Sequence, residues 1–232
     1  ARSRQRSRGT RRVGRGPSHL MKIVSLCVGA AKQISWRGES VSTAIFKSPV
    51  ENAVIGKLGL EGDQQADLAV HGGPDKAVYA YSADHYPWWK EQLPGVELPY
   101  GAFGENLTIE GLNDNEIYLG SEYRAGTARL LAIQPRLPCS KLGLRFNDPS
   151  MVKRFAQSRR LGIYFRVLEL GRVRVGDAFI KTSEHKIRLP LLDLAGMYFD
   201  AELTPAKARP ALEHPALNDN WREMLSKRLK KA

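Results

Sequence analysis

The chain has 232 residues, of which 42% are hydrophobic and 26% are charged, and its mean hydropathy is −0.37. This length accommodates one large domain, or one domain with a small appendage, and this composition excludes a wholly disordered or collagen-like chain. No apolar run approaches the roughly 20 residues that a membrane-spanning helix needs, so we expect no membrane partner.

The formal net charge of +12 would by itself favour a nucleic-acid partner. However, residues 1–20 contain seven arginines and no acidic residue, so the remainder of the chain is only mildly basic. An Arg-, Ser- and Gly-rich stretch without apolar periodicity cannot bury enough surface to offset its ordering entropy. We therefore expect a disordered extension over residues 1–20, and nucleic-acid binding is not the favoured function.

Short β-type runs separated by Gly, Pro, Asn and Asp dominate residues 21–185, a pattern typical of an all-β barrel or sandwich. The longest irregular stretch, residues 48–76, has the length of a functional loop. The runs that we expect as strands are residues 22–28, 41–46, 77–81, 106–109, 116–119, 129–133, 162–170 and 173–180.

Two helices interrupt the β pattern, and the chain becomes helical after it. Ser82 is a good cap for a helix over 82–93, and Asp148 or Ser150 can cap a helix over 151–157. The last residues, 186–232, are predicted to form a small all-α domain with helices over 189–198, 205–214 and 216–229. Leu217, Trp221, Met224 and Leu225 share one apolar face of the last helix, which should pack on the barrel or on a second copy in a homodimer.

Cys139 directly follows a predicted strand, and Pro135 and Pro138 restrict the backbone that leads to it. Nearby cations favour the thiolate, which is both a nucleophile and a soft metal ligand. Three cations lie within six positions of the sulfur: Arg136, Lys141 and Arg145. The alternative is an inert cysteine beside unrelated surface charges. Cys27 lies among apolar neighbours in a predicted strand, which indicates a core position.

A second group of candidates lies in residues 62–79, where titratable side chains stand among glycines that let a ligand approach the backbone. His71 is a candidate proton donor near neutral pH, and Lys76 is a candidate phosphate ligand. The alternative makes Asp63 a turn residue, Asp67 a cap and His71 a core residue.

Two other positions could carry chemistry. Residues 101–108 place Glu105 and Asn106 between glycines and a strand, although a hairpin turn explains this stretch equally well. Arg166 lies in the middle of a predicted strand. If it faces inward it needs an anionic partner or a wet pocket, and if it faces outward it needs neither.

Five motifs follow one another along the chain: Gly62-Asp63 with Ala66-Asp67, His71-Gly72-Gly73-Pro74-Asp75-Lys76-Ala77-Val78, Phe103-Gly104-Glu105-Asn106-Leu107-Thr108, Gln134-Pro135-Arg136 with Pro138-Cys139 and Lys141-Leu142, and Gly171-Arg172-Val173 with Gly176-Asp177. Together they resemble the MOSC family, named after the C-terminal domain of molybdenum-cofactor sulfurases, and in particular its YiiM-like branch. The segments Pro215-Ala216-Leu217, Trp221-Arg222 and Lys227-Arg228-Leu229 are similar to the three-helix domain appended in that branch.

The resemblance implies a mainly β, MOSC-type barrel with a few peripheral helices, which binds a molybdenum cofactor (Mo-molybdopterin). It also implies an oxidoreductase that detoxifies N-hydroxylated bases such as hydroxylaminopurine by reducing them to the amine. Cys139 is then the catalytic molybdenum ligand, and His71 is the candidate for protonating the departing oxygen. The residues expected to bind the cofactor are Asp63, Gly72, Gly73, Lys76, Asn106, Arg136, Lys141, Arg145 and Arg166.

The sequence lacks a flavin or nicotinamide fingerprint and the cysteines for an iron–sulfur cluster, so we expect a separate electron-donor protein. Two cysteines provide no disulfide framework, which favours a reducing compartment such as the cytoplasm. Two alternatives remain open: Cys139 transfers sulfur as a persulfide, or the protein binds the cofactor without catalysis. Because no candidate ligand lies in the helical tail, we expect Trp221→Ala to lower stability and to leave cofactor binding intact.

Overall fold

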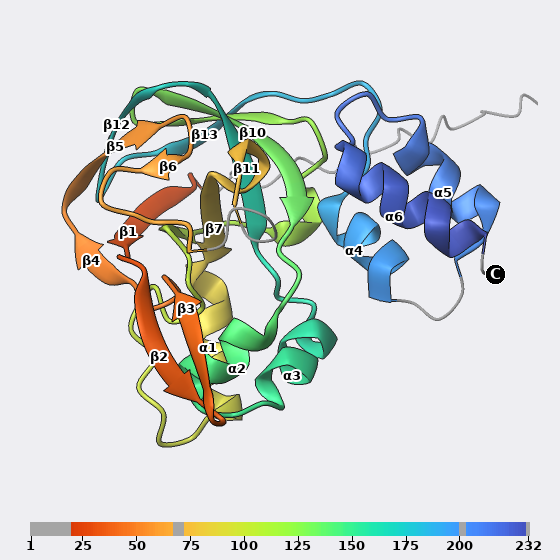
Figure 1. The fold of residues 1–232 in the computed structure, drawn as a ribbon. Coiled ribbons are helices and arrows are strands. Elements are labelled where there is room, and N and C mark those ends of the chain that lie inside the picture. Colours follow the sequence, from red (N-terminus) through yellow and green to blue (C-terminus); the bar gives the residue numbers. More distant parts are fainter. Residues whose placement is uncertain (1–19, 67–71, 200–202, 231–232) are drawn as a thin grey trace, which may run out of the picture.

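The computed structural model describes residues 20–66, 72–199 and 203–230, and it shows a sheet-rich body with helices on two sides (Figure 1). Within these residues the strands are β1 (Lys22–Val28), β2 (Lys32–Trp36), β3 (Glu39–Thr43), β4 (Ser48–Val50), β5 (Asn52–Gly56), β6 (Gly59–Leu60), β7 (Val78–Ser82), β8 (Leu107–Glu110), β9 (Glu122–Ala125), β10 (Ala128–Pro135), β11 (Ile163–Glu169), β12 (Gly171–Arg174) and β13 (Phe179–Ser183).

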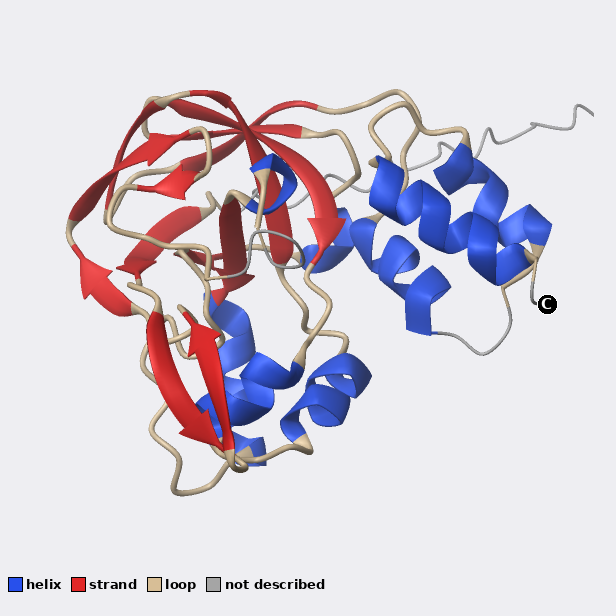
Figure 2. Ribbon diagram, viewed as in Figure 1, coloured by secondary structure: helices blue, strands red, loops and turns tan. Residues whose placement is uncertain are grey.

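Helices α1, α2 and α3 lie together at one end of the body, and α4, α5 and α6 lie together beside it (Figure 2). The α-helices of the described residues are α1 (Tyr86–Gln92), α2 (Ser140–Phe146), α3 (Met151–Ser158), α4 (Leu191–Phe199), α5 (Pro205–Leu212) and α6 (Asp219–Leu229). The 3-10 helices are η1 (Pro74–Lys76), η2 (Ala83–His85) and η3 (Asp114–Glu116).

The main sheet has eight strands in the order β13-β9-β10-β11-β7-β8-β1-β4. Among the strands of the described residues, only β7 and β8 pair in parallel, and η2 and α1 lie in the crossover that such a connection requires. A three-stranded sheet, β12-β5-β6, and the hairpin β2-β3 complete the strands of the described residues. Within those residues no ladder joins β13 to β4, although Lys22 and Ala178 form an isolated bridge. The structure therefore confirms a sheet-rich fold with several helices but does not confirm the predicted β-barrel.

Several predicted elements are confirmed, and three are wrong. β1 has the predicted bounds, and α3 begins at the predicted Met151. Residues 116–119 form no strand, because only Tyr118 bridges to Pro190. Residues 48–76 are not one irregular loop, because they contain β4, β5 and β6. Residues 173–180 are not one strand, because the chain turns at Gly176, where φ is 94°.

Two apolar clusters form the interior. One lies among the sheet strands and includes Ile23, Leu130 and Phe165. The other is rich in aromatic side chains, and its Trp89 from α1 and Phe155 from α3 stack at 5.7 Å between ring centroids. Because these short helices bury their apolar faces against the sheet, they hold the loops between them in place.

The C-terminal residues form the three expected helical segments, and these pack on the sheet. The side chain of Thr204 caps α5, and that of Asn218 caps α6 by accepting from the Trp221 N–H at 3.0 Å. Trp221 and Leu225 belong to the same apolar cluster as the sheet strands. The predicted docking on the rest of the chain is thus confirmed, whereas the boundary of a separate domain at residue 186 stays a prediction.

Among the described residues, no helix is both long enough and apolar enough to cross a membrane.

Candidate functional site

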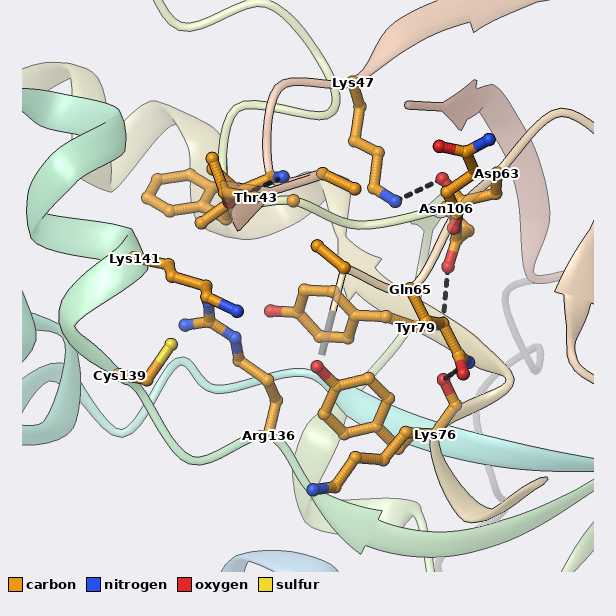
Figure 3. Close-up of a pocket in the computed structure, with 17 residues that line it drawn as sticks. Thr43, Lys47, Asp63, Gln65, Lys76, Tyr79, Asn106, Arg136, Cys139 and Lys141 are labelled. Carbon is orange, nitrogen blue, oxygen red and sulfur yellow. Dashed lines mark hydrogen bonds and ion pairs between the residues drawn. The ribbon is translucent and has the colours of Figure 1, made fainter. Parts of the chain in front are cut away.

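A cavity of about 100 Å³, partly open to solvent, lies where segments far apart in the sequence meet (Figure 3). Six of the predicted site residues line it: Asp63, Lys76, Asn106, Arg136, Cys139 and Lys141. Gly72, Gly73, Arg145 and Arg166 are not among the lining residues. The catalytic candidate His71 lies outside the described residues.

Cys139 occupies the junction between β10 and α2. Its backbone is extended, with φ of −131°, and the first turn of α2 begins at the next residue. Sequence analysis did not predict α2, whose Leu142 and Leu144 are buried and anchor it against the body. The thiol is partly exposed at the cavity wall, as the predicted presentation from a restricted segment requires.

Arg136 is a buried cation that faces the cavity from the end of β10. Its guanidinium lies 5.6 Å from the ring centroid of Tyr79 and 5.0 Å from that of Phe155. Burial acts to lower its pKa, but the phenols of Tyr79 and Tyr164 and the thiol of Cys139 raise it, and the net pKa is raised. Its Nη1 is buried and has no hydrogen-bond partner in the described part of the chain. An unpartnered N–H on a buried cation is suited to an anionic ligand.

Asp63 joins three segments at the opposite wall of the cavity. Its carboxylate accepts hydrogen bonds from the Gly29 N–H at 2.7 Å and from Asn106 Nδ2 at 2.9 Å, and it forms an ion pair with Lys47. The Lys47 and Asp63 side chains are only 7% and 9% exposed. Sequence analysis missed Lys47, which precedes Asp63 by 16 residues and belongs to none of the motifs.

Asn106 has an architectural role at this wall. Its Oδ1 accepts from the Tyr79 N–H at 3.0 Å, and its Nδ2 also donates to the Cys27 carbonyl at 3.2 Å. The amide therefore connects β7, β1 and the Asp63 loop. Cys27 itself is fully buried, as predicted, and burial raises the pKa of its thiol.

The segment before Lys76 is held by a glutamine that sequence analysis did not single out. Gln65 Oε1 accepts from the Gly73 N–H at 2.9 Å, and its Nε2 donates to the Lys76 carbonyl at 3.3 Å. Gly73 has φ of 90°, a conformation that favours glycine. Gly73 thus shapes the turn that brings Lys76 to the cavity.

Two tyrosines that were not predicted form the aromatic part of the wall. The rings of Tyr79 and Tyr164 lie 5.1 Å apart at 38°. The Tyr79 hydroxyl donates to the Leu161 carbonyl at 2.8 Å, whereas Tyr164 is partly exposed. Burial raises the pKa of both phenols, so both stay protonated near neutral pH. Tyr79 directly follows the motif 71–78, which is the one signal that could have revealed it.

Glu105 holds the turn that precedes β8. Its buried carboxylate accepts from the Gly101 N–H at 2.8 Å, from the Phe103 N–H at 3.1 Å and from the hydroxyl groups of Thr108 and Tyr86. Residues before β8 therefore form a turn, but not the hairpin turn of the alternative, because β8 pairs in parallel with the preceding strand β7.

The two remaining predicted arginines lie elsewhere. Arg145 is half-buried, its guanidinium is 5.2 Å from the Phe46 ring centroid, and burial lowers its pKa. Arg166 faces outward and pairs with Asp75, with Nε donating to Oδ1 at 2.7 Å. Neither lines the cavity.

The fold and the cavity thus define a sheet-rich domain that presents the thiol of Cys139 and several cations to one pocket. The family model described as the MOSC domain matches residues 67–179. The uncharacterized protein YflK of Bacillus subtilis (strain 168) is 39% identical over 209 residues, which cover 89% of this chain and 93% of YflK. Protein YiiM of Escherichia coli (strain K12) is 31% identical over 193 residues, or 82% of this chain and 86% of YiiM.

A crystal structure of YiiM from Geobacillus stearothermophilus has a TM-score of 0.76 at 35% identity, and the match covers 90% of this chain and 99% of that one. The chain belongs to the MOSC domain family, with YiiM proteins among its relatives, as the sequence motifs predicted. A protein of Gibberella moniliformis named "Reductase" is 37% identical over 159 residues, which are 67% of this chain and 28% of that longer protein.

Proposed function

We propose that this protein is a molybdenum-cofactor-dependent reductase of N-hydroxylated purines and related N-hydroxylated compounds, with Cys139 as the molybdenum ligand. One observation carries the proposal: the same cavity is lined by the partly exposed Cys139 and by buried Arg136, whose Nη1 has no hydrogen-bond partner among the described residues. The membership in the MOSC family and the fungal relative named "Reductase" support the redox class.

The residues present fit such a cofactor. A thiolate is a soft ligand, which suits a metal carried by sulfur atoms of a pterin. A phosphate group needs charge compensation when it leaves water, and Arg136, Lys141 and Lys76 line the cavity. The other two predicted cationic ligands, Arg145 and Arg166, do not line the cavity and are not part of this proposal.

The bound cofactor would supply the two-electron chemistry that cleaves the N–O bond, and a separate protein would supply the electrons. The residues of this chain would bind the cofactor and orient the substrate. The aromatic ring of Tyr164 offers a surface for a planar base, and its protonated hydroxyl can donate a hydrogen bond. His71 remains our candidate for protonating the departing oxygen, since its motif leads directly to Lys76.

The test is to purify the protein from a host that makes the cofactor, to measure its molybdenum and pterin content, and to assay hydroxylaminopurine reduction with a supplied electron source. Cys139→Ser should abolish turnover and molybdenum retention while the melting temperature changes little. Cys27→Ala is the matched control, because it removes the other thiol away from the cavity and should keep the metal. Full molybdenum content and turnover in Cys139→Ser would contradict the proposal.

A second experiment, on the wild-type protein, separates the sulfur-transfer alternative. After incubation with a cysteine desulfurase, one added sulfur atom on Cys139, detected by mass spectrometry in a protein without reductase activity, would favour a persulfide carrier.

A further inference from the structure

The backbone that leads to Lys76 is held by side chains of other segments. The Asp75 carbonyl accepts from Gln134 Nε2 at 3.1 Å, and the Asp75 carboxylate pairs with Arg166. Lys76 is the next residue and lines the cavity. The position of Lys76 therefore depends on where Gln134 holds Asp75.

Gln134 is buried in β10, and both ends of its amide are used. While Nε2 donates to the Asp75 carbonyl, Oε1 accepts from the indole N–H of Trp221 at 2.7 Å. An indole nitrogen can only donate a hydrogen bond. It thus selects the amide orientation in which Nε2 faces Asp75, since the flipped amide would place two donors together at Trp221 and two acceptors together at Asp75.

Trp221 is itself rigidly held. It lies in the first turn of α6, where its backbone N–H donates to the capping side chain of Asn218 at 3.0 Å. It is buried in the apolar cluster of the sheet together with Leu217 and Leu225. The position of the Gln134 amide therefore depends on the position of α6.

A second connection runs along β10. Gln134 is followed by Pro135 and by Arg136, the buried cation of the cavity, whose backbone N–H donates to the Gly162 carbonyl at 3.1 Å. Anchoring Gln134 thus restrains two cations of the cavity: Lys76 through Asp75, and Arg136 through the strand.

We propose that α6 is a positioning element of the cavity: Trp221 orients Gln134, and Gln134 places Lys76 and Arg136 for binding of an anionic group. This inference rests on the anion-binding role that the proposed function assigns to the cavity. It departs from the expectation that the helical tail has no influence on the site.

The test measures binding of inorganic phosphate to the purified full chain by NMR titration, well below the melting temperature. Trp221→Phe removes the indole N–H and keeps an aromatic ring, and it should weaken phosphate binding about threefold to tenfold, the effect of one hydrogen bond. Gln134→Leu should weaken it to a similar extent. In the Gln134→Leu background, Trp221→Phe should weaken phosphate binding no further, because the hydrogen bond between Trp221 and Gln134 is already lost.

Leu225→Ala is the matched control. It removes a buried side chain of α6 that cannot form a hydrogen bond with Gln134, so it should lower the melting temperature while phosphate affinity stays within about twofold of wild type. The positioning role would be overturned, and the anion-binding role left standing, by either of two results. One is unchanged phosphate affinity in both Trp221→Phe and Gln134→Leu, and the other is a loss of phosphate affinity in Leu225→Ala as large as in those two variants. Failure of the wild-type protein to bind phosphate would overturn it together with the anion-binding role of the cavity.

Discussion

Replacing Asp63 with alanine removes the carboxylate that connects three segments at the cavity wall. The variant leaves the Lys47 ammonium buried without its partner, and it leaves the Gly29 N–H and one donor of Asn106 without their acceptor. Removing one member of a buried ion pair typically costs about 3–5 kcal/mol. For a chain of this size, that corresponds to a fall in melting temperature of roughly 6–20 °C.

Urea unfolding followed by circular dichroism measures this loss. Asp84→Ala is a suitable control, because Asp84 is exposed and its carboxylate accepts from the Gly111 N–H at 3.1 Å at the surface. It should cost no more than about 1 kcal/mol. Adding Lys47→Met to Asp63→Ala should restore part of the lost stability by removing the unpaired charge. A free energy of unfolding for Asp63→Ala within about 1 kcal/mol of wild type would refute the reasoning.

Trp221→Ala should lower the free energy of unfolding by about 3–5 kcal/mol, because it empties a buried site between α6 and the sheet, and calorimetry would detect this. A change below about 1 kcal/mol would show that α6 contributes little to the core. Burial lowers the pKa of His214, whose Nδ1 accepts from the Ala216 N–H at 3.1 Å. The unfolded chain therefore takes up this proton first as the pH falls below about 6.5, and stability is lost from that pH downward. Urea unfolding at several pH values should show a smaller acid-side loss for His214→Gln, and an equal loss would contradict this assignment.

Local sequence patterns predicted strands whose residues are both buried and hydrogen-bonded to a neighbouring strand. They gave a wrong prediction where residues are buried without forming such hydrogen bonds. β1 was found with correct bounds because it is a short, mostly apolar run, and most of its residues are buried. In residues 116–119, Ile117 and Leu119 are buried as a strand would bury them, yet the chain forms only a bridge at Tyr118. The hairpin of β2 and β3 was missed in part because its strands are largely exposed.

The candidate site shows the same division. Arg136, Lys141 and Cys139 could be predicted together because they lie within one short segment. Lys47 and Tyr164 could not, since each reaches the cavity through tertiary pairing that no local spacing records. The hydrogen bond between Trp221 and Gln134 is a further example, because 87 residues separate its two members.

The two cysteines differ sharply in accessibility, since Cys27 is 0% exposed and Cys139 is partly exposed at the cavity. A maleimide reagent applied to the native protein should therefore label one sulfur, whereas the denatured chain offers two. Because of this selectivity, a fluorophore or spin label could be attached at the cavity without any substitution. The fraction of molecules protected from labelling would then measure the fraction that carry a ligand in the cavity.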